Sequence, residues 1–587
     1  MSFSDPGPAG PKRAALIASA AEPSPEIAFV TLRSEGIALI YGSDAHAIEA
    51  GNSLKEHLDV TVLITPPAAV VLPPMSEFPI AKGKIRSAKG YLGAFEITVD
   101  EFAQPLPSSA VPSFKPSRDG AVSRCDVLLD LSGGPPLFPA ADVREGYVRA
   151  DPGSPSALLS AVMKARDLVG VFDKPRYITF SDHLCAHSRS KIVGCTRCLE
   201  LCPTSAIVPA GEHVSIDPNI CAGCGQCAAA CPTGAASYAL PPSDALLRKL
   251  RALLLAYRNA GGERAIVLLH DEPHGAPLID ALAGLGEGLP AHVLPFSVNE
   301  VTQIGLEAFA ALFAYGASAV RVLLPARPRH DISGLGATIA LAEPILAGLG
   351  FGPGRIAIIE ADDPDLLGTA LRAIPAMPCA PRPASFLPVG DKRGVLRFSL
   401  RELHRAAPEP VDIIALPAGA PFGAVQVREA GCTLCLSCVS ACPTHALTDD
   451  KERPMLRFAE DACVQCGLCA ATCPEQVITL EPRLQFRNGA GESRVLKEEE
   501  PYRCIRCRKP FGVKSTIDRV VAKLADKHWM FKDSPERVDL IKMCEDCRVA
   551  FVTEKEFDPY GAPPPARTTD DYLRERAEDQ ASTKLDG

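Results

Sequence analysis

The sequence predicts a multidomain protein that combines α/β domains, built on parallel sheets, with small cysteine-rich α+β modules. The chain has 587 residues, which corresponds to about four domains at roughly 150 residues each. Two stretches, 36–65 and 241–375, alternate apolar runs with amphipathic runs, as βαβ units do. Residues 66–125 contain many prolines and show no clear period. The 22 cysteines are concentrated in short groups, which is typical of metal ligation in a reducing compartment rather than of disulfides.

The most regular cysteine group lies between residues 432 and 474. Each half has the spacing C-x2-C-x2-C-x3-C-P, the bacterial run for a pair of [4Fe–4S] clusters. Three thiolates of each half cap one cubane, and the fourth reaches the other cubane. The predicted ligand sets are therefore Cys432, Cys435, Cys438 and Cys473 for one cluster and Cys442, Cys463, Cys466 and Cys469 for its partner. Structural zinc would not explain the third thiolate of each half.

A second group, between residues 185 and 232, departs from this spacing at its first ligand. Ile192 stands where the first cysteine is expected, and Cys185 is the nearest substitute. We therefore predict Cys185 as the fourth ligand, with His187 as a nitrogen ligand or a three-iron cluster as the alternatives. The crossed pattern assigns Cys185, Cys195, Cys198 and Cys231 to one cluster and Cys202, Cys221, Cys224 and Cys227 to the other.

A third group consists of two CxxC pairs separated by a long insert. Its members are Cys504, Cys507, Cys544 and Cys547. Two such pairs supply four thiolates in a tetrahedral array, which predicts structural zinc. A rubredoxin-like iron or a fifth cluster could use the same ligands. The insert contains a predicted helix over 517–528, opened by Thr516.

The N-terminal part is expected to be a Rossmann-like α/β domain over 31–180. It follows a stretch, 1–30, that is rich in proline, alanine and serine and is predicted to be disordered. A strand at 36–41, a helix at 45–57 and a strand at 60–65 form the opening βαβ unit. The turn offers one glycine, Gly42, and places Asp44 where a phosphate would lie. The glycine fingerprint of dinucleotide binding is therefore missing.

The middle domain, 241–375, is expected to contain a parallel sheet covered on both faces. Strands are predicted at 265–269, 292–296, 319–324 and 355–359, and helices at 276–285, 301–315, 336–349 and 363–373. Polar residues follow the strand ends, where ligands bind in such folds; they are His270, His274, Arg327, Arg329 and His330. Ordinary solvated loop residues are the favoured interpretation, and a ligand-binding edge is the alternative. The domain follows the first cysteine module, 181–240. After it come a linker at 376–425, the second module at 426–485, the four-cysteine region at 486–560 and a disordered tail at 561–587.

Charge and hydropathy narrow the class of partner. The formal net charge is −9, and four clusters with one four-thiolate zinc would bring it to about −19. Such a charge argues against nucleic acid and favours redox partners with a basic docking face. The longest uncharged apolar stretch, 308–320, is too short to span a bilayer. We expect a cytoplasmic protein without membrane insertion.

The cysteine-rich stretches 185–232 and 432–474 resemble the dicluster ferredoxin family. The middle domain has a weaker resemblance to the delta subunit of methyl-viologen-reducing hydrogenase, carried by 314–320 and 348–355, although that subunit's [2Fe–2S] cysteines have no counterpart. The whole chain is similar to a proteobacterial four-cluster ferredoxin-type family, through 416–423, 463–467 and 568–572. That resemblance implies an association with formate dehydrogenase genes.

The predicted function is that of an iron–sulfur electron carrier. Four [4Fe–4S] clusters would relay single electrons between redox enzymes, and a formate dehydrogenase system is the partner that the resemblance implies. We predict no catalytic residue, because no nucleophile–base pair or paired carboxylates stand out. Two alternatives remain, a maturation factor for a partner redox enzyme and a flavin-linked oxidoreductase subunit. The sequence therefore favours a carrier or complex subunit over a self-sufficient enzyme.

Overall fold

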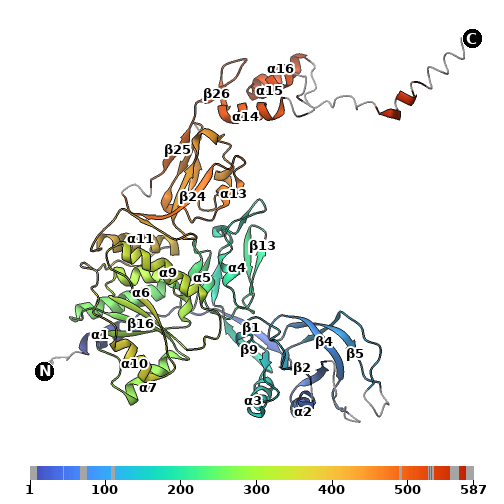
Figure 1. Cartoon of the computed structure of the whole chain (residues 1–587), viewed down its shortest axis with the longest axis vertical. Helices are drawn as coiled ribbons and strands as arrows, with labels where there is room; N and C mark the ends of the chain where they lie inside the picture. The colour runs from blue at the N-terminus through green and yellow to red at the C-terminus, as the bar shows by residue number, and fades with distance from the viewer. Residues whose placement is uncertain are drawn as a thin grey trace, which may run out of the picture. The chain divides into compact units, whose positions relative to one another are not determined.

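The computed structural model describes residues 9–43, 45–65, 76–106, 113–450, 453–487, 492–525, 528, 531, 535–555, 568–570, 572–574 and 576 (Figure 1). They form two compact units. The first comprises 1–423, 463–467 and 482–490, and the second the remainder of the chain. Each unit is described by itself. None of the described helices combines the length and the apolar character that a bilayer crossing needs.

A seven-stranded sheet forms the N-terminal α/β part, in the order β6-β5-β4-β3-β2-β7-β8. The predicted βαβ unit is present as β2 (Ile37–Gly42), α2 (Ala45–Leu54) and β3 (Asp59–Ile64), with β2 parallel to β3 and to β7 (Val127–Leu131). Asp44 lies outside the described residues. The other strands are β4 (Ile80–Lys89), β5 (Phe95–Ala103), β6 (Ala121–Cys125) and β8 (Tyr147–Arg149), of which β5 and β6 run antiparallel to their neighbours. Helix α3 (Pro155–Arg166) buries Ala161 and Ala165 in the same core.

Two further segments of the N-terminal part hold charged residues that are considered below. Strand β9 (Gly170–Pro175), which pairs antiparallel with β1 (Phe29–Ser34), contains Lys174. A short helix, η1 (Ala141–Val143), precedes β8 and is directly followed by Arg144.

The N-terminus contains a helix, α1 (Gly10–Ala20), so the prediction of disorder over 1–30 is wrong for these residues. Ala15 is fully buried in the core that includes α6 (Ser243–Asn259). The Ser19 hydroxyl donates to the carbonyl of Lys249 at 3.2 Å, and Lys12 Nζ donates to the carbonyl of Pro290 at 3.3 Å. These partners are distant in sequence, which explains why local composition missed the helix.

The middle domain has the predicted parallel sheet, in the order β17-β16-β18-β19. Its strands are β16 (Ile266–Asp271), β17 (Val293–Val298), β18 (Ala319–Leu324) and β19 (Ile356–Glu360). Its helices are α7 (Gly275–Leu285), α8 (Leu306–Ala314), α9 (Ser333–Gly348) and α10 (Pro364–Arg372), with a short η3 (Val301–Gln303) before α8. The residues of β16 and β18 are buried throughout, as strands covered on both faces are.

A further helix, α11 (Lys392–Arg405), lies in the stretch predicted as a linker, and that prediction is wrong for these residues. The Asp391 side chain caps it by accepting from the N–H of Gly394 at 2.6 Å. Its buried face consists of Val395, Leu396, Ser399, Leu400 and Leu403. Because this face covers α8, every residue of α8 is buried.

The first cysteine module is a small α+β structure within the first unit. Two of its antiparallel pairs are β10 (Ile178–Phe180) with β15 (Ala236–Tyr238) and β13 (Ile207–Ala210) with β14 (His213–Ile216). Its helices are α4 (Arg197–Leu201) and α5 (Gln226–Ala230), and η2 (Asp182–Leu184) precedes Cys185. A hairpin of β11 (Ser188–Arg189) and β12 (Ile192–Val193) occupies the atypical loop between Cys185 and Cys195. In the first unit, β20 (Ile413–Ala415) also pairs with the end of β24 (Ile478–Gln485).

The second unit contains the other cysteine module and the four-cysteine region. A sheet of β22 (Leu447–Asp449), β23 (Met455–Phe458) and β25 (Arg494–Glu498) accompanies β21 (Gly423–Val427), η4 (Glu429–Gly431), α12 (Ser437–Ser440), η5 (Glu460–Ala462) and α13 (Leu468–Thr472). The four-cysteine region has β26 (Pro501–Arg503), β27 (Pro510–Val513), α14 (Lys514–Leu524), α15 (Pro535–Ile541) and α16 (Glu545–Lys555). Helix α14 thus begins before and ends earlier than the predicted helix over 517–528. The predicted tail, 561–587, lies mostly outside the described residues.

Candidate metal-binding sites

The first module brings Cys185 into the same group as the thiols with which it was predicted to bind a cluster. Burial is the main cause that raises the pKa of Cys198, to about 12, and the charges of Cys195, Cys231 and Cys185 raise it further. Burial also raises the pKa of Cys195, with added contributions from Cys231 and Cys185. Cys185 itself is buried, with 7 % of its surface exposed. Since such charge effects fall off with distance, these four thiols are neighbours.

The other crossed group is assembled in the same way. Burial raises the pKa of Cys224 to about 12, and the charges of Cys221 and Cys202 add to the effect. The pKa of Cys227 lies well above its ordinary value for the same reasons, burial first and then Cys224, Cys221 and Cys202. Cys202 therefore faces the three thiols of the other half, as the crossed pattern predicted.

Both halves of this module present their trailing cysteine in one local geometry. The N–H of Ala206 donates to Cys202 Sγ at 3.3 Å, and the N–H of Ala236 donates to Cys231 Sγ at 3.4 Å. Thr204 and Thr233 place their hydroxyls 3.8 and 3.6 Å from the same sulfurs. N–H donors stabilise a thiolate, whereas burial without a cation opposes it. Buried thiolates are stabilised by a positively charged partner, and an iron–sulfur core is such a partner for soft sulfur ligands.

His187, the alternative ligand, is buried beside this group. Its Nδ1 lies 3.1 Å from the carbonyl oxygen of Cys195, and 4 % of the residue is exposed. This contact occupies one ring nitrogen, so a metal could bind only through Nε2. The choice between Cys185 and His187 stays a prediction, and it is tested below.

In the second unit, four predicted ligands line one small cavity. They are Cys432, Cys435, Cys438 and Cys473. Apolar side chains such as Leu434, Leu456 and Ile478 complete the wall. Burial raises the pKa of Cys438 to about 12, and the charges of Cys435, Cys432 and Cys473 contribute in the same direction. A small cavity lined by four thiols and apolar side chains fits the first predicted cluster of this module.

The ligands predicted for its partner cluster are described in two different units. Cys463 and Cys466 belong to the first unit, where the Cys463 carbonyl accepts from Arg393 Nη2 at 2.7 Å. Cys442 belongs to the second unit, and its sulfur lies 3.8 Å from the hydroxyl of Thr444, as in the Cys-Pro-Thr turns of the first module. Cys469 also lies in the second unit. The assignment of these four residues to one cluster stays a prediction.

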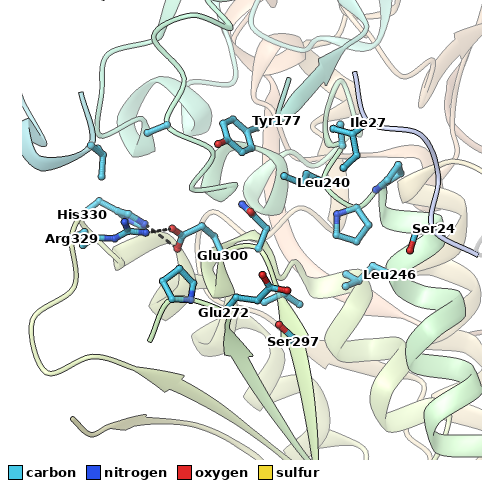
Figure 2. A pocket seen from close by; sticks show the side chains of 18 of the residues that line it. Ser24, Ile27, Tyr177, Leu240, Leu246, Glu272, Ser297, Glu300, Arg329 and His330 are labelled. Atoms are coloured by element: carbon cyan, nitrogen blue, oxygen red, sulfur yellow. Dashed lines mark hydrogen bonds and ion pairs between the residues drawn. The ribbon is translucent and has the colours of Figure 1, made fainter. Parts of the chain in front are cut away.

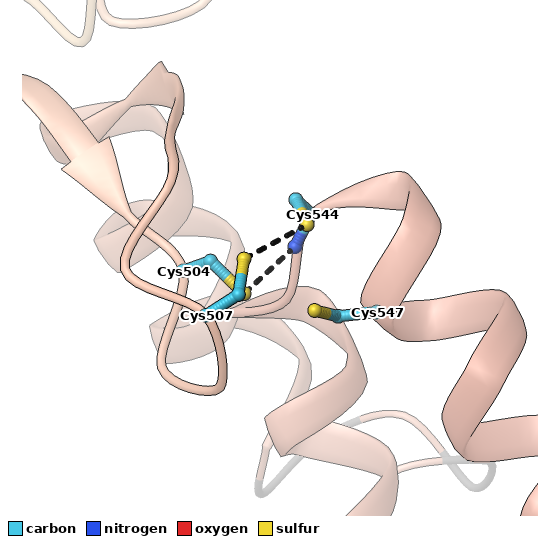
Figure 3. Close-up of side chains that lie close together, drawn as sticks. All are labelled: Cys504, Cys507, Cys544 and Cys547. Atoms are coloured by element: carbon cyan, nitrogen blue, oxygen red, sulfur yellow. Dashed lines mark hydrogen bonds between the residues drawn. The ribbon is translucent and has the colours of Figure 1, made fainter.

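The four-cysteine region gathers its thiols around a single point (Figure 3). All four sulfurs of Cys504, Cys507, Cys544 and Cys547 lie within 4.8 Å of one another, and Cys507 Sγ is 3.6 Å from Cys544 Sγ. Metal–sulfur bonds of about 2.3 Å in a tetrahedron place sulfurs about 3.8 Å apart, so the spacing suits one ion. Although burial opposes it, N–H donors from Cys507, Cys544 and Arg506 lower the pKa of Cys504 to about 6. A thiolate is therefore ready to bind metal at neutral pH.

A cavity of about 740 Å³ lies at the carboxyl ends of β16 and β17 (Figure 2). At one end, Glu300 pairs with Arg329 at 3.0 Å and lies 3.6 Å from His330. Tyr177 and Ala222 also line the cavity, and Ala222 directly follows Cys221. The sequence analysis interpreted Arg329 and His330 as solvated loop residues. It missed Tyr177 and Glu300, because the two residues are distant in sequence and lie in different parts of the fold.

The other polar residues singled out after the strand ends do not line this cavity. His270 is buried with its Nδ1 2.9 Å from the carbonyl oxygen of Asp271, and burial lowers its pKa. His274 Nε2 lies 3.2 Å from Asp362 Oδ1. His270 is therefore a buried residue of β16, and its interpretation as a solvated loop residue is wrong. His274 lies in the loop that precedes α7.

Comparison with known families gives two matches. A model of a 4Fe-4S dicluster domain matches residues 193–235, and another model of a 4Fe-4S dicluster domain matches residues 431–478. The chain therefore carries two ferredoxin-type 4Fe–4S dicluster domains. Cys185 lies before the first matched stretch, as expected for an atypical ligand. No curated protein matches the chain.

Proposed function

We propose that this protein is an iron–sulfur electron carrier that holds four [4Fe–4S] clusters and passes single electrons between partner redox proteins. One observation carries the proposal: each stretch that matches a 4Fe-4S dicluster domain also contains thiols that lie close together as the crossed ligand pattern requires. When bound, the clusters supply one-electron redox chemistry. The protein's residues provide thiolates, N–H donors to sulfur and an apolar surround that excludes water.

The partners would be redox proteins with basic docking faces, since the chain is acidic before any cluster is added. A formate dehydrogenase system in the cytoplasm is the partner suggested by the sequence resemblance. We further propose zinc at the four-cysteine site, as a structural ion that holds the C-terminal region together.

The first test is a metal and sulfide assay with EPR of the anaerobic, dithionite-reduced full-length protein. We expect about sixteen irons, about sixteen sulfides and coupled S = 1/2 signals, because each of four cubanes holds four irons and four sulfides. One zinc per chain is expected in the same assay. About twelve irons or fewer would contradict the four-cluster carrier and favour a maturation role.

The cavity beside the first module favours a second candidate, a flavin-linked oxidoreductase subunit. Its volume of about 740 Å³ lies within the range of small-molecule sites, and parallel α/β sheets bind ligands at this edge. If this candidate is right, protein purified from its native host should release a flavin on denaturation, seen by absorption and fluorescence. Protein that carries its iron but releases no flavin, and binds no added FMN, would exclude it.

A further inference from the structure

Two buried cations from the N-terminal part of the chain flank one predicted cluster site. Arg144 is 7 % exposed and Lys174 is 6 % exposed. Arg144 Nη2 donates to the carbonyl of Thr204 at 2.6 Å, and its Nη1 donates to the carbonyl of Gly90 at 3.2 Å. Lys174 Nζ donates to the carbonyl of Asn219 at 2.9 Å. Thr204 follows Cys202 and Asn219 precedes Cys221, so the cations lie beside two ligands of the same group.

The pKa shifts of the two cations and of a neighbouring thiol agree with this proximity. Burial lowers the pKa of Arg144, and the charge of Cys202 acts against that effect. Burial likewise lowers the pKa of Lys174, while Glu145 and Cys221 act to raise it. In return, Lys174 lowers the pKa of Cys221, which burial raises. Each cation therefore acts directly on a predicted cluster ligand.

Three carboxylates lie near the same group of ligands. Glu145 is exposed, so water and salt screen it. Asp217 is half-buried, and its Oδ1 accepts from the backbone N–H of Asn219 at 2.8 Å. Burial raises the pKa of Cys224, and the charge of Glu300 adds to that effect, but Glu300 is itself paired with Arg329 at 3.0 Å. Arg144 and Lys174 are more deeply buried than Glu145 and Asp217, and buried charges interact more strongly than solvated ones because the surrounding dielectric is lower.

The neighbouring site of the same module has a weaker cation. Arg197 lowers the pKa of Cys195, whereas burial raises it. Its side chain donates to the carbonyl of Gly419 in an exposed contact at 2.7 Å. A lysine whose side chain is buried, Lys392, also lies near this site: its Nζ donates to the carbonyl of Ala229 at 2.9 Å, but it lies 3.6 Å from the buried Glu307, which offsets its charge. Each site has four thiols, a Cys-Pro-Thr turn and N–H donors to sulfur, and the two sites differ in the buried cations Arg144 and Lys174.

On the basis of the proposed function, we propose that Arg144 and Lys174 raise the reduction potential of the cluster held by Cys202, Cys221, Cys224 and Cys227. An added electron makes a cluster more negative, so a buried cation stabilises the reduced form. We expect each cation to change the electron distribution between the two clusters of the module about tenfold, or about 59 mV for a one-electron couple. The electron of a singly reduced module then resides beside Ala222, at the wall of the cavity.

The test is an EPR-monitored redox titration of the full-length, cluster-loaded protein. We expect R144M and K174M each to lower the midpoint potential of one S = 1/2 signal by about 59 mV, which corresponds to a tenfold change for a one-electron couple. The midpoint potentials of the other signals should not change. The charge-conserving variants R144K and K174R should stay near the wild-type midpoint. R149Q is the matched control, because Arg149 is an exposed cation of the same domain that lies 3.9 Å from Asp130.

The outcomes separate this inference from the proposed function. Loaded K174M with an unmoved midpoint would overturn the inference, and so would an equal shift in K174R or R149Q. Arg144 also donates to two backbone carbonyls, so R144M can lose iron because the local structure changes. In that case the midpoint potentials of K174M and K174R decide whether the inference holds. Wild-type protein without four clusters would instead overturn the proposed function itself.

Discussion

Replacement of Cys185 by serine is expected to remove at least one of about sixteen irons and to abolish the S = 1/2 signal of one reduced [4Fe–4S] cluster. The reason is that the other three thiols of this group, Cys195, Cys198 and Cys231, cannot complete a cubane's four ligands by themselves. Cys185 is buried among them, and serine is a poor ligand for a soft iron–sulfur core. Iron and sulfide content, with EPR of the reduced protein, measures the loss.

The matched control is Cys125, a thiol in the core of the N-terminal sheet. It is 4 % exposed, and burial raises its pKa to about 12, so it is a neutral packing residue. C125S should keep its full iron content. If C185S also keeps every iron, Cys185 is not a ligand. H187A then distinguishes the alternatives, since a histidine ligand predicts loss of the cluster and a three-iron cluster predicts none.

Replacement of Cys504 by serine is expected to lower the metal content of the four-cysteine site from one ion to none. The four sulfurs lie within 4.8 Å of one another, close enough for one ion to be bound by all four. Structural zinc supplies about 10–16 kcal/mol of folding free energy in small zinc domains. Loss of the ion should therefore make residues 501–555 sensitive to limited proteolysis, while the iron content is unchanged.

Acid should release the same ion from the wild-type protein. The pKa of Cys504 is depressed to about 6 from an ordinary value of 9.0, so the thiolate form is stabilised in the folded protein above that pH. Metal affinity should decline as the pH falls and should decline most steeply below about 6, where Cys504 is protonated in addition to Cys547, whose pKa is raised to about 12. C379S serves as the control for C504S, because Cys379 is a half-buried thiol outside the group. A wild-type chain that holds no zinc but one more iron than C504S would contradict the zinc assignment.

The short intervals between cysteines in the sequence were enough to predict which of them lie together. A cubane takes three thiolates from one tight loop, so its signature lies within a few residues, as in Cys221, Cys224 and Cys227. The same locality explains the correct strands of the middle domain, since β16 and β18 are buried on both faces and appear as continuous apolar runs.

Tertiary structure decided the features whose partners are distant in sequence. Helix α1 is ordered by contacts with α6, and α11 by its apolar face on α8; composition shows neither contact. The cations Arg144 and Lys174 reach the first module from segments that precede it in the chain. Glu300 of the middle domain and Tyr177, which directly precedes the first module, line the same cavity. The sequence by itself thus predicted which thiols form each candidate metal site, because ligand spacing is local. Which charges surround each cluster depended on long-range packing, which no short motif encodes.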